Sequence, residues 1–384
     1  MRILSVGDEV REGTYALHSR FSRAVSFTDG KRLVSLVTPE IGPGPLNIVI
    51  QDPATLLRHL ADHPIPRRAD TCRADNRRAD VCRVDRRHLD KRHTSKRHLD
   101  KCLPDKRCGG SSRRLEESAQ SALSSRQLEP RLSSTGLSVH GAGAARATRT
   151  LSAGMTRAGC NTALSPILRI GRYSVSLANR RWVFSRVHSY QSLLPIKEGS
   201  SAEVFRQNLQ VLTQLLVREA NPRSLAFLLD AKRARSFTTG FETAFVRRIK
   251  AGVRLLRRGH RAEGATLLRG CGFGLTPSGD DLLAGWLIGL NLLQQAGGRD
   301  FSSAIRAIYR AAKGRSLVCN AFLRLARDGR VNGNMRNLIS ALLRNGADSV
   351  RTAARRVLDQ GETSGADLAT GFVMATRSNC ARTS

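Results

Sequence analysis

Hydrophobic and polar positions give the first part of the chain the periodicity of β-structure. RAVSFTDGKRLVSLVT has two short apolar runs, one on each side of Asp29 and Gly30. An Asp-Gly pair between two such runs is a strong signal for a β-hairpin. LNIVI (46–50) predicts a further strand after the breaker-rich GPGP, and PATLLRHLADH (53–63) predicts a short helix.

The last part of the chain changes from β-like to helical spacing. PILRIGRYSVSLANRRWVF (166–184) has two short β-like runs around Gly171 and Arg172. After Gly199 apolar residues recur at helical spacing almost to the end. The predicted helical segments are 201–220, 242–260, 261–270, Ser302 to Ala312, Ser316 to Arg327, Asn334 to Arg344 and Ser349 to Asp359. The pattern predicts an α+β protein, in which a small N-terminal β-rich domain precedes a larger helical C-terminal domain.

Between these parts lies a basic segment with a strict period of five. Aspartate occupies positions 70, 75, 80, 85, 90, 100 and 105, and Ser95 fills the missing place. A pentapeptide-repeat β-helix needs an apolar residue at the centre of each repeat, but these centres are almost all polar. Three histidines five residues apart (His88, His93, His98) do not share one helix or strand face, so they would not converge on a metal or a nucleic acid. The composition favours a solvated, disordered insert.

These boundaries give three predicted parts. Residues 1–65 together with 164–190 form the β-rich domain, 66–163 form the disordered insert, and 191–377 form the helical domain. The β-like runs after the insert are expected to rejoin the first sixty residues in one domain.

Charge and composition narrow the possible functions. The formal net charge of +33 points toward anionic partners, but only 5% of residues are aromatic, so platforms for stacking bases are scarce. We therefore rank nucleic-acid binding behind the other functions considered below. The eight cysteines include no CxxC pair, which indicates reduced thiols. The N-terminus has no apolar core for a signal peptide, and the longest apolar run, Leu282–Leu293, is too short to cross a bilayer, so a cytoplasmic protein without membrane contact is expected.

The chemistry-bearing stretch is GCGFGLTPSGDDLLAGW (270–286). Its glycines and Thr-Pro-Ser-Gly turn lead directly into an apolar helix. Ser278 and Asp281 have the spacing of a capping box, or alternatively Thr276 caps and Pro277 takes the first helical position. Exposed amides at a helix N-terminus bind anions well, and glycine lets a ligand approach the backbone. The same features also occur in ordinary capped helices, where acids in the first turn need no ligand.

A second copy of the pattern S-G-x-D-L-x-x-G-aromatic strengthens the functional interpretation. It occurs at 278–286 and again at 364–372. A glycine inside a helix costs about 1 kcal/mol relative to alanine, so its repetition suggests close packing. We expect the two helices to cross near their N-termini and to present both Ser-Gly ends to one anion.

Together with the upstream IGRYSV and the N-terminal GPG before a strand, these motifs resemble the AllH-type subunit family of oxamate carbamoyltransferase. The resemblance covers about residues 20–55 and 166–377 and leaves out the insert. It implies transfer of a carbamoyl group between phosphate and an amide nitrogen, in the interconversion of oxalurate with phosphate and oxamate with carbamoyl phosphate during allantoin and purine breakdown. It also implies a hetero-oligomer with two other carbamoyltransferase subunits. Phe273 and Cys319 depart from the family pattern, where proline and a small hydroxyl residue are usual, and these departures bear on the substrate.

The resemblance and the helix-end chemistry together give a candidate site. The candidate catalytic residues are Asp280 and Asp281. The residues assigned to the anion or substrate are Gly270, Gly272, Gly274, Thr276, Ser278, Gly279, Ser364, Gly365 and Asp367.

The two adjacent aspartates leave a helix about 100° apart, so they cannot perform one task together. We assign Asp281 to capping, as for Asp367, and Asp280 to proton transfer or to holding a divalent cation, with an ordinary solvated acid as the alternative. No other cofactor and no metal-ligand cluster is predicted. Two other classes of function stay open: a non-catalytic scaffolding or small-anion-binding subunit, and nucleic-acid binding through the insert.

Overall fold

A computed structural model of the chain describes residues 2–51, 167–177, 180–183, 187–195, 201–272, 275–297, 299–344 and 346–380. They all belong to one unit, Met1–Arg78 with Thr162–Ser384, and the second unit, Ala79–Asn161, lies outside them. The helix predicted at 53–63 and the predicted disordered insert also lie outside the described residues.

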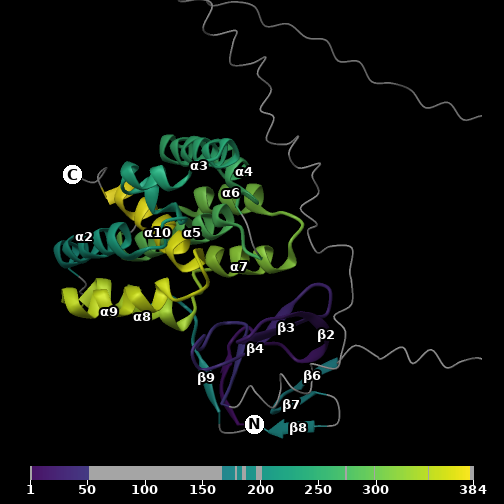
Figure 1. Cartoon of the computed structure of the whole chain (residues 1–384). Coiled ribbons are helices and arrows are strands. Elements are labelled where there is room, and N and C mark those ends of the chain that lie inside the picture. Colours follow the sequence, from purple (N-terminus) through teal and green to yellow (C-terminus); the bar gives the residue numbers. More distant parts are fainter. Residues whose placement is uncertain are drawn as a thin grey trace, which may run out of the picture. The chain divides into compact units, whose positions relative to one another are not determined.

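The described strands form one sheet with the order β8-β7-β6-β2-β3-β4-β5-β1-β9. Their bounds are β1 Ile3–Gly7, β2 Gly13–Arg20, β3 Ala24–Thr28, β4 Leu33–Val37, β5 Asn47–Ile50, β6 Ile167–Gly171, β7 Ser174–Leu177, β8 Arg180–Val183 and β9 His188–Tyr190. Neighbouring strands are antiparallel except β4 with β5 and β1 with β9. Strands from before and after the basic segment therefore pair directly, β6 with β2 and β9 with β1 (Figure 1).

Local sequence explains much of this sheet. The hairpin predicted at Asp29 and Gly30 is present as β3 and β4. Asp29 Oδ1 accepts hydrogen bonds from the Lys31 and Arg32 amides at 2.9 and 2.6 Å, and Gly30 has the left-handed φ of 92° that the turn requires. Side chains on one face of the sheet form its apolar core, which includes Tyr15, Phe27, Ile48, Leu168 and Val175.

The rest of the described chain is helical, as predicted, so the fold is α+β with a strand-rich N-terminal part and a helical C-terminal part. The α-helices are α2 Ala202–Glu219, α3 Gly240–Arg258, α4 Arg261–Leu268, α5 Ser278–Gly297, α6 Ser302–Ala312, α7 Leu317–Arg327, α8 Gly333–Arg344, α9 Ala347–Leu358 and α10 Ser364–Cys380. Two short 3-10 helices, η5 (Leu225–Leu228) and η6 (Ala231–Ser236), connect α2 to α3. None of the described helices is both long and apolar enough to cross a membrane.

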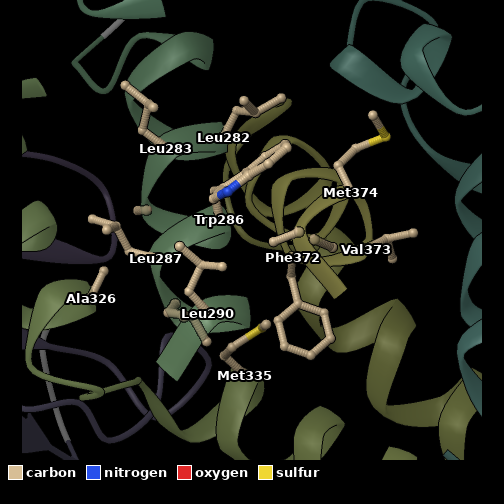
Figure 2. Close-up of a cluster of buried hydrophobic side chains, with 14 of the residues drawn as sticks. Leu282, Leu283, Trp286, Leu287, Leu290, Ala326, Met335, Phe372, Val373 and Met374 are labelled. Atoms are coloured by element: carbon tan, nitrogen blue, oxygen red, sulfur yellow. The ribbon is translucent and has the colours of Figure 1, made fainter. Parts of the chain in front are cut away.

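Helices α5 and α10 form the centre of the helical part (Figure 1). Trp286, Leu287 and Leu290 of α5 are buried together with Phe372 and Val373 of α10 (Figure 2). The pair approaches closely because glycine lies at the contact from both sides. A Cβ added at Gly285 would collide with the carbonyl oxygen of Leu368, and one added at Gly371 would collide with that of Leu282.

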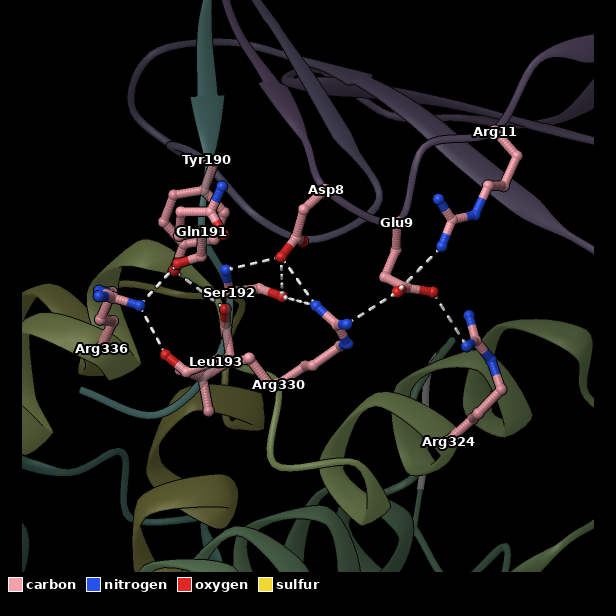
Figure 3. Close-up of polar contacts among 11 residues, drawn as sticks. Asp8, Glu9, Arg11, Tyr190, Gln191, Ser192, Leu193, Arg324, Arg330 and Arg336 are labelled. Carbon is pink, nitrogen blue, oxygen red and sulfur yellow. Dashed lines mark hydrogen bonds and ion pairs between the residues drawn. The ribbon is translucent and has the colours of Figure 1, made fainter. Parts of the chain in front are cut away.

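A polar seam joins the sheet to α7 and α8 (Figure 3). Asp8 Oδ2 accepts hydrogen bonds from the Ser192 amide at 3.0 Å and from Arg330 Nη1 at 2.7 Å. Glu9 forms ion pairs with Arg330 at 3.1 Å and Arg324 at 3.2 Å. These contacts fix the end of the sheet that carries the β1–β2 loop and the segment after β9.

The GPG turn predicted to precede a strand makes a second connection. Pro43 O accepts a hydrogen bond from the Gly333 amide at 2.8 Å, and a Cβ at Gly333 would crowd the Pro43 ring. Gly333 is the first residue of α8, so the turn before β5 rests on the start of this helix.

Candidate functional site

The predicted site begins where the chain leaves α4 and turns toward α5. Gly270 and Gly272 have left-handed φ values of 65° and 118°, which side-chain-bearing residues rarely adopt. A Cβ at Gly272 would also lie 2.6 Å from the Ser278 amide nitrogen. These two glycines are therefore explained by backbone geometry. Gly274, also assigned to the anion, lies outside the described residues.

The buried side chain of Asp280 binds the backbone of this turn. Its Oδ1 accepts a hydrogen bond from the Gly270 amide at 2.8 Å, and the side chain is buried, with the residue 8% exposed. The alternative of an ordinary solvated acid is therefore wrong. Burial raises the pKa of Asp280 above its usual value, while the Gly270 amide offsets part of that rise.

Gly279 and Gly365 occupy the same position in the two copies of the repeated pattern, and the same packing explains both. A Cβ at Gly279 would collide with the carbonyl oxygen of Leu268 at the end of α4. A Cβ at Gly365 would collide with the carbonyl oxygen of Val357 near the end of α9. Their amides donate within the protein, Gly279 to Cys271 O at 2.7 Å and Gly365 to Gln360 O at 3.0 Å. Close packing thus accounts for both glycines, and a role in binding an anion stays a prediction.

The N-termini of α5 and α10 meet, as the repeated pattern predicted. Thr276 Oγ1 lies 2.9 Å from Ser364 Oγ. The shared anion itself is not tested by this contact. Amides that could face such an anion are those of Thr276 and Ser278, because neither donates a backbone hydrogen bond to another described residue.

The predicted capping box at the start of α5 is wrong in detail. Ser278 is itself the first helical residue, and the Pro277 carbonyl accepts from the Asp281 amide at 3.1 Å. The alternative cap at Thr276 with Pro277 as the first helical residue is also displaced, because α5 begins one residue later. The side chains instead make contacts across the helix crossing. Ser278 and Asp281 contact α10 instead of capping α5, so their spacing in the sequence predicted the wrong partners.

Asp281 and Asp367 are the acids that make those cross-helix contacts. Hydrogen bonding from Ser364 on α10 lowers the pKa of Asp281 in part, and hydrogen bonding from Ser278 on α5 does the same for Asp367. Burial outweighs these contacts, raising the pKa of Asp281 well above its usual value and that of Asp367 to about 7. Each helix therefore begins with a serine that contacts the aspartate of the other.

Asp367 has one further partner that the sequence did not indicate. Its Oδ1 accepts a hydrogen bond from the Leu225 amide at 2.6 Å, at the start of η5. Leu225 is 142 residues earlier in the chain, and an apolar residue gives no local signal for such a role.

A third helix N-terminus, that of α7, reaches the same place. Cys319 in the first turn of α7 lies with Sγ 3.7 Å from Leu275 O, and its thiol also contacts Asp280. Burial is the main reason that the pKa of Cys319 rises to about 12, so the thiol is protonated and not a nucleophile at neutral pH. Ser316 caps α7 by accepting from the Cys319 amide at 3.3 Å. Three helix N-termini, each with a positive dipole end, thus surround Leu275 and Thr276.

Basic residues lie beside this site. Arg269 precedes Gly270, and its Nη1 donates to Lys313 O at 3.1 Å, so the α4 end is tied to the turn between α6 and α7. Arg269, Lys313 and Arg315 are all exposed. No group of three or more His, Cys, Asp or Glu side chains within the described ranges could hold a metal ion, so the cation predicted at Asp280 has no set of ligands there.

The structural class is α+β, with a strand-rich N-terminal part and a helical part in which α5 and α10 each begin with the sequence S-G-x-D. Residues 268–376 match the family described as Oxamate carbamoyltransferase subunit AllH. This segment contains both copies of the repeated pattern, and the match confirms the resemblance predicted from them. No curated protein and no solved structure matches the chain significantly.

Proposed function

We propose that the chain is a subunit of a carbamoyltransferase that acts on a small carboxylate or amide. The reaction is the interconversion of oxamate and carbamoyl phosphate with oxalurate and phosphate, in the breakdown of allantoin and purines. The observation that carries the proposal is the coincidence of the AllH match at 268–376 with the meeting point of three helix N-termini. Two further subunits would complete the enzyme.

The chemistry of this reaction fits a helix-end site. In the phosphorolytic direction a phosphate oxygen forms a bond to the carbamoyl carbon of oxalurate, the bond from that carbon to the amide nitrogen breaks, and a proton passes from phosphate to this nitrogen. Positive helix ends and backbone amides stabilise phosphate and the negative charge that develops on the carbamoyl oxygen. The hydroxyl of Thr276 and the amides of Thr276 and Ser278 are the groups that would contact phosphate or a substrate carboxylate.

Asp280 is the candidate for proton transfer. Burial raises its pKa toward neutrality, which brings a carboxyl group closer to the range where a general acid or base is most effective. Its Oδ1 accepts from the Gly270 amide and the Cys319 thiol also contacts the carboxyl group, so these two neighbours hold the carboxyl in place. Asp281 and Asp367 contribute to holding the α5 and α10 ends in place.

The test is reconstitution of this chain with its two candidate partner subunits. Phosphate-dependent release of carbamoyl phosphate from oxalurate is measured for the wild type and for Asp280→Asn. We expect turnover to fall by about 100-fold or more while the complex still assembles, because loss of a general acid or base typically costs 10² to 10⁴ in rate. The matched control is Asp359→Asn, which alters an exposed acid at the end of α9 and should leave turnover unchanged.

A second function, a non-catalytic scaffolding or small-anion-binding subunit, is favoured by one observation. Packing explains Gly279 and Gly365, and contacts within the protein engage Asp281 and Asp367, so most of the repeated pattern has a structural use. Assembly with unchanged turnover in Asp280→Asn would support this alternative and contradict a role for Asp280 in proton transfer.

A further inference from the structure

Helix α3 is the most basic of the described helices. It carries five arginines and one lysine between residues 247 and 258, and its single acid, Glu242, lies in the first turn and pairs with Arg223. The opposite side of the helix packs tightly on α4, where a Cβ added at Gly264 would lie 2.8 Å from the carbonyl oxygen of Gly252. The basic side chains therefore have no neighbouring acid on their own helix.

The contacts of these basic residues divide them into two groups. Arg248 Nε donates to a backbone carbonyl of α4 at 2.8 Å, and Lys250 lies over the Phe227 ring at 5.9 Å, so both contribute to packing within the protein. Three further arginines are exposed and form no hydrogen bond, ion pair or ring contact with any residue that the structure describes: Arg247, Arg254 and Arg258.

Helical geometry places these three arginines in one row. At about 100° and 1.5 Å per residue, they lie within about 40° of one another and span about 16 Å along the helix. Arg254 and Arg258 are four residues apart, where two like charges destabilise a helix. The negative end of the helix dipole favours Arg258 in the last turn, but it does not reach Arg247 or Arg254. The row thus has a cost that no described contact offsets.

The side chains beside this row are apolar. Ala251 and Leu255 are partly exposed, and neither belongs to the buried core of the helical part. Small and apolar residues flanked by arginine are typical of a protein interface, since arginine is enriched there. A nucleic-acid backbone offers nothing apolar to such residues, and the row has no aromatic side chain on which a base could stack. A second copy of the same face would be repelled, because arginines would meet arginines.

We propose that the outer face of α3, formed by Arg247, Ala251, Arg254, Leu255 and Arg258, docks an acidic amphipathic helix of a partner subunit. Carboxylates on that helix bond the guanidinium groups, and its apolar side chains cover Ala251 and Leu255. The small side chain of Ala251 lets the partner approach closely. The inference rests on the proposed function only in taking the partner to be another subunit of the same enzyme.

The experiment measures the affinity of the full chain for each of its two candidate partner subunits at several salt concentrations. Arg247→Glu combined with Arg254→Glu reverses the charge at two positions of the face. Arg254→Glu places a carboxylate four residues from both Lys250 and Arg258, so this variant should keep its stability in urea denaturation. We expect its affinity for one subunit to fall at least tenfold at low salt, and the salt dependence of binding seen in the wild type to be largely lost.

The matched control is Arg306→Glu combined with Arg310→Glu, which reverses two exposed charges one turn apart on α6 and should leave the affinity unchanged. Equal weakening in the two double variants would assign the effect to net charge and overturn the proposal. Binding of an oligonucleotide through the α3 arginines, with subunit affinity unaffected by their reversal, would also overturn it. So would failure of the wild type to bind either subunit, whereas assembly without carbamoyl transfer would contradict only the reaction proposed above.

Discussion

The hydroxyl oxygens of Thr276 and Ser364 lie 2.9 Å apart although 88 residues separate them in the chain. Each residue stands at the start of a helix, and the two helices then cross with glycine at the contact. This contact between the two hydroxyls therefore forms only when the N-termini of α5 and α10 lie side by side.

Replacing Thr276 by valine removes this hydroxyl and keeps the shape of the side chain. We expect a loss of about 1 kcal/mol in the free energy of unfolding, the typical net contribution of one hydrogen bond. The measurement is urea denaturation, with Thr266→Val as control, because the Thr266 hydroxyl is exposed and bonds within its own helix at 2.8 Å. Equal effects in the two variants would mean that the contact with Ser364 does not stabilise the fold.

Gly285→Ala tests the close approach of α5 and α10. The new Cβ would collide with the carbonyl oxygen of Leu368, and backbone on both sides leaves little room to relax. We expect destabilisation of about 3 kcal/mol or more, measured as a fall in the denaturation midpoint. Gly297→Ala, at the other end of the same helix, meets nothing within 4 Å and should be neutral or slightly stabilising. A midpoint for Gly285→Ala close to that of Gly297→Ala would show that the helices are further apart than described.

The raised pKa of Asp367 predicts how stability depends on pH. Burial raises this pKa from 3.8 to about 7, so between these values the folded state holds a proton that the unfolded state has lost. The stabilisation is fully present below pH 3.8 and is lost as pH rises through about 7, at a rate on the order of 1 kcal/mol per pH unit.

The measurement is the free energy of unfolding at several pH values. Asp367→Asn removes the titrating group while its side-chain oxygen can still accept from the Leu225 amide, so the slope between pH 4 and 7 should become shallower. Asp359→Asn should retain the slope of the wild type. An unchanged slope in Asp367→Asn would assign the pH dependence to other groups.

Arg330 is expected to be the most important residue of the polar seam. It bonds Asp8 at 2.7 Å and Glu9 at 3.1 Å, with its side chain only 22% exposed. Arg330→Met leaves two acids without this partner in a largely buried setting, and we expect a loss of about 3 kcal/mol in thermal or urea denaturation. Arg351→Met breaks an exposed pair with Asp348 and should change stability by less than about 0.5 kcal/mol. The prediction fails if the two variants are equally stable.

The sequence predicted correctly the helices and turns that are determined by neighbouring residues. The helix from Ser302 to Ala312 has the predicted bounds because its apolar residues follow one face, and the hairpin at Asp29 and Gly30 forms because the turn residues specify it. The crossing of α5 and α10 was also foreseen, since the repeated glycines indicated close packing at both helices.

What the sequence could not supply were partners far apart in the chain. The Leu225 amide bonds Asp367 across 142 residues, and no pattern of residue types points to a backbone group. Ser278 and Asp281 have the spacing of a cap, but each faces the other helix because burial at the crossing favours those contacts. The parallel pairing of β1 with β9 likewise depends on a long-range arrangement that strand propensity does not specify.

The polar seam also bears on the order in which the protein can fold during synthesis. Asp8 and Arg330 are 322 residues apart, and a chain leaves the ribosome from its N-terminus. The pairing of β3 with β4 needs only neighbouring residues, so it can form early. Asp8 and Glu9, by contrast, cannot bind Arg324 of α7 or Arg330 of the α7–α8 connection until nearly the whole chain has emerged. The sheet and the helices are therefore joined late in synthesis.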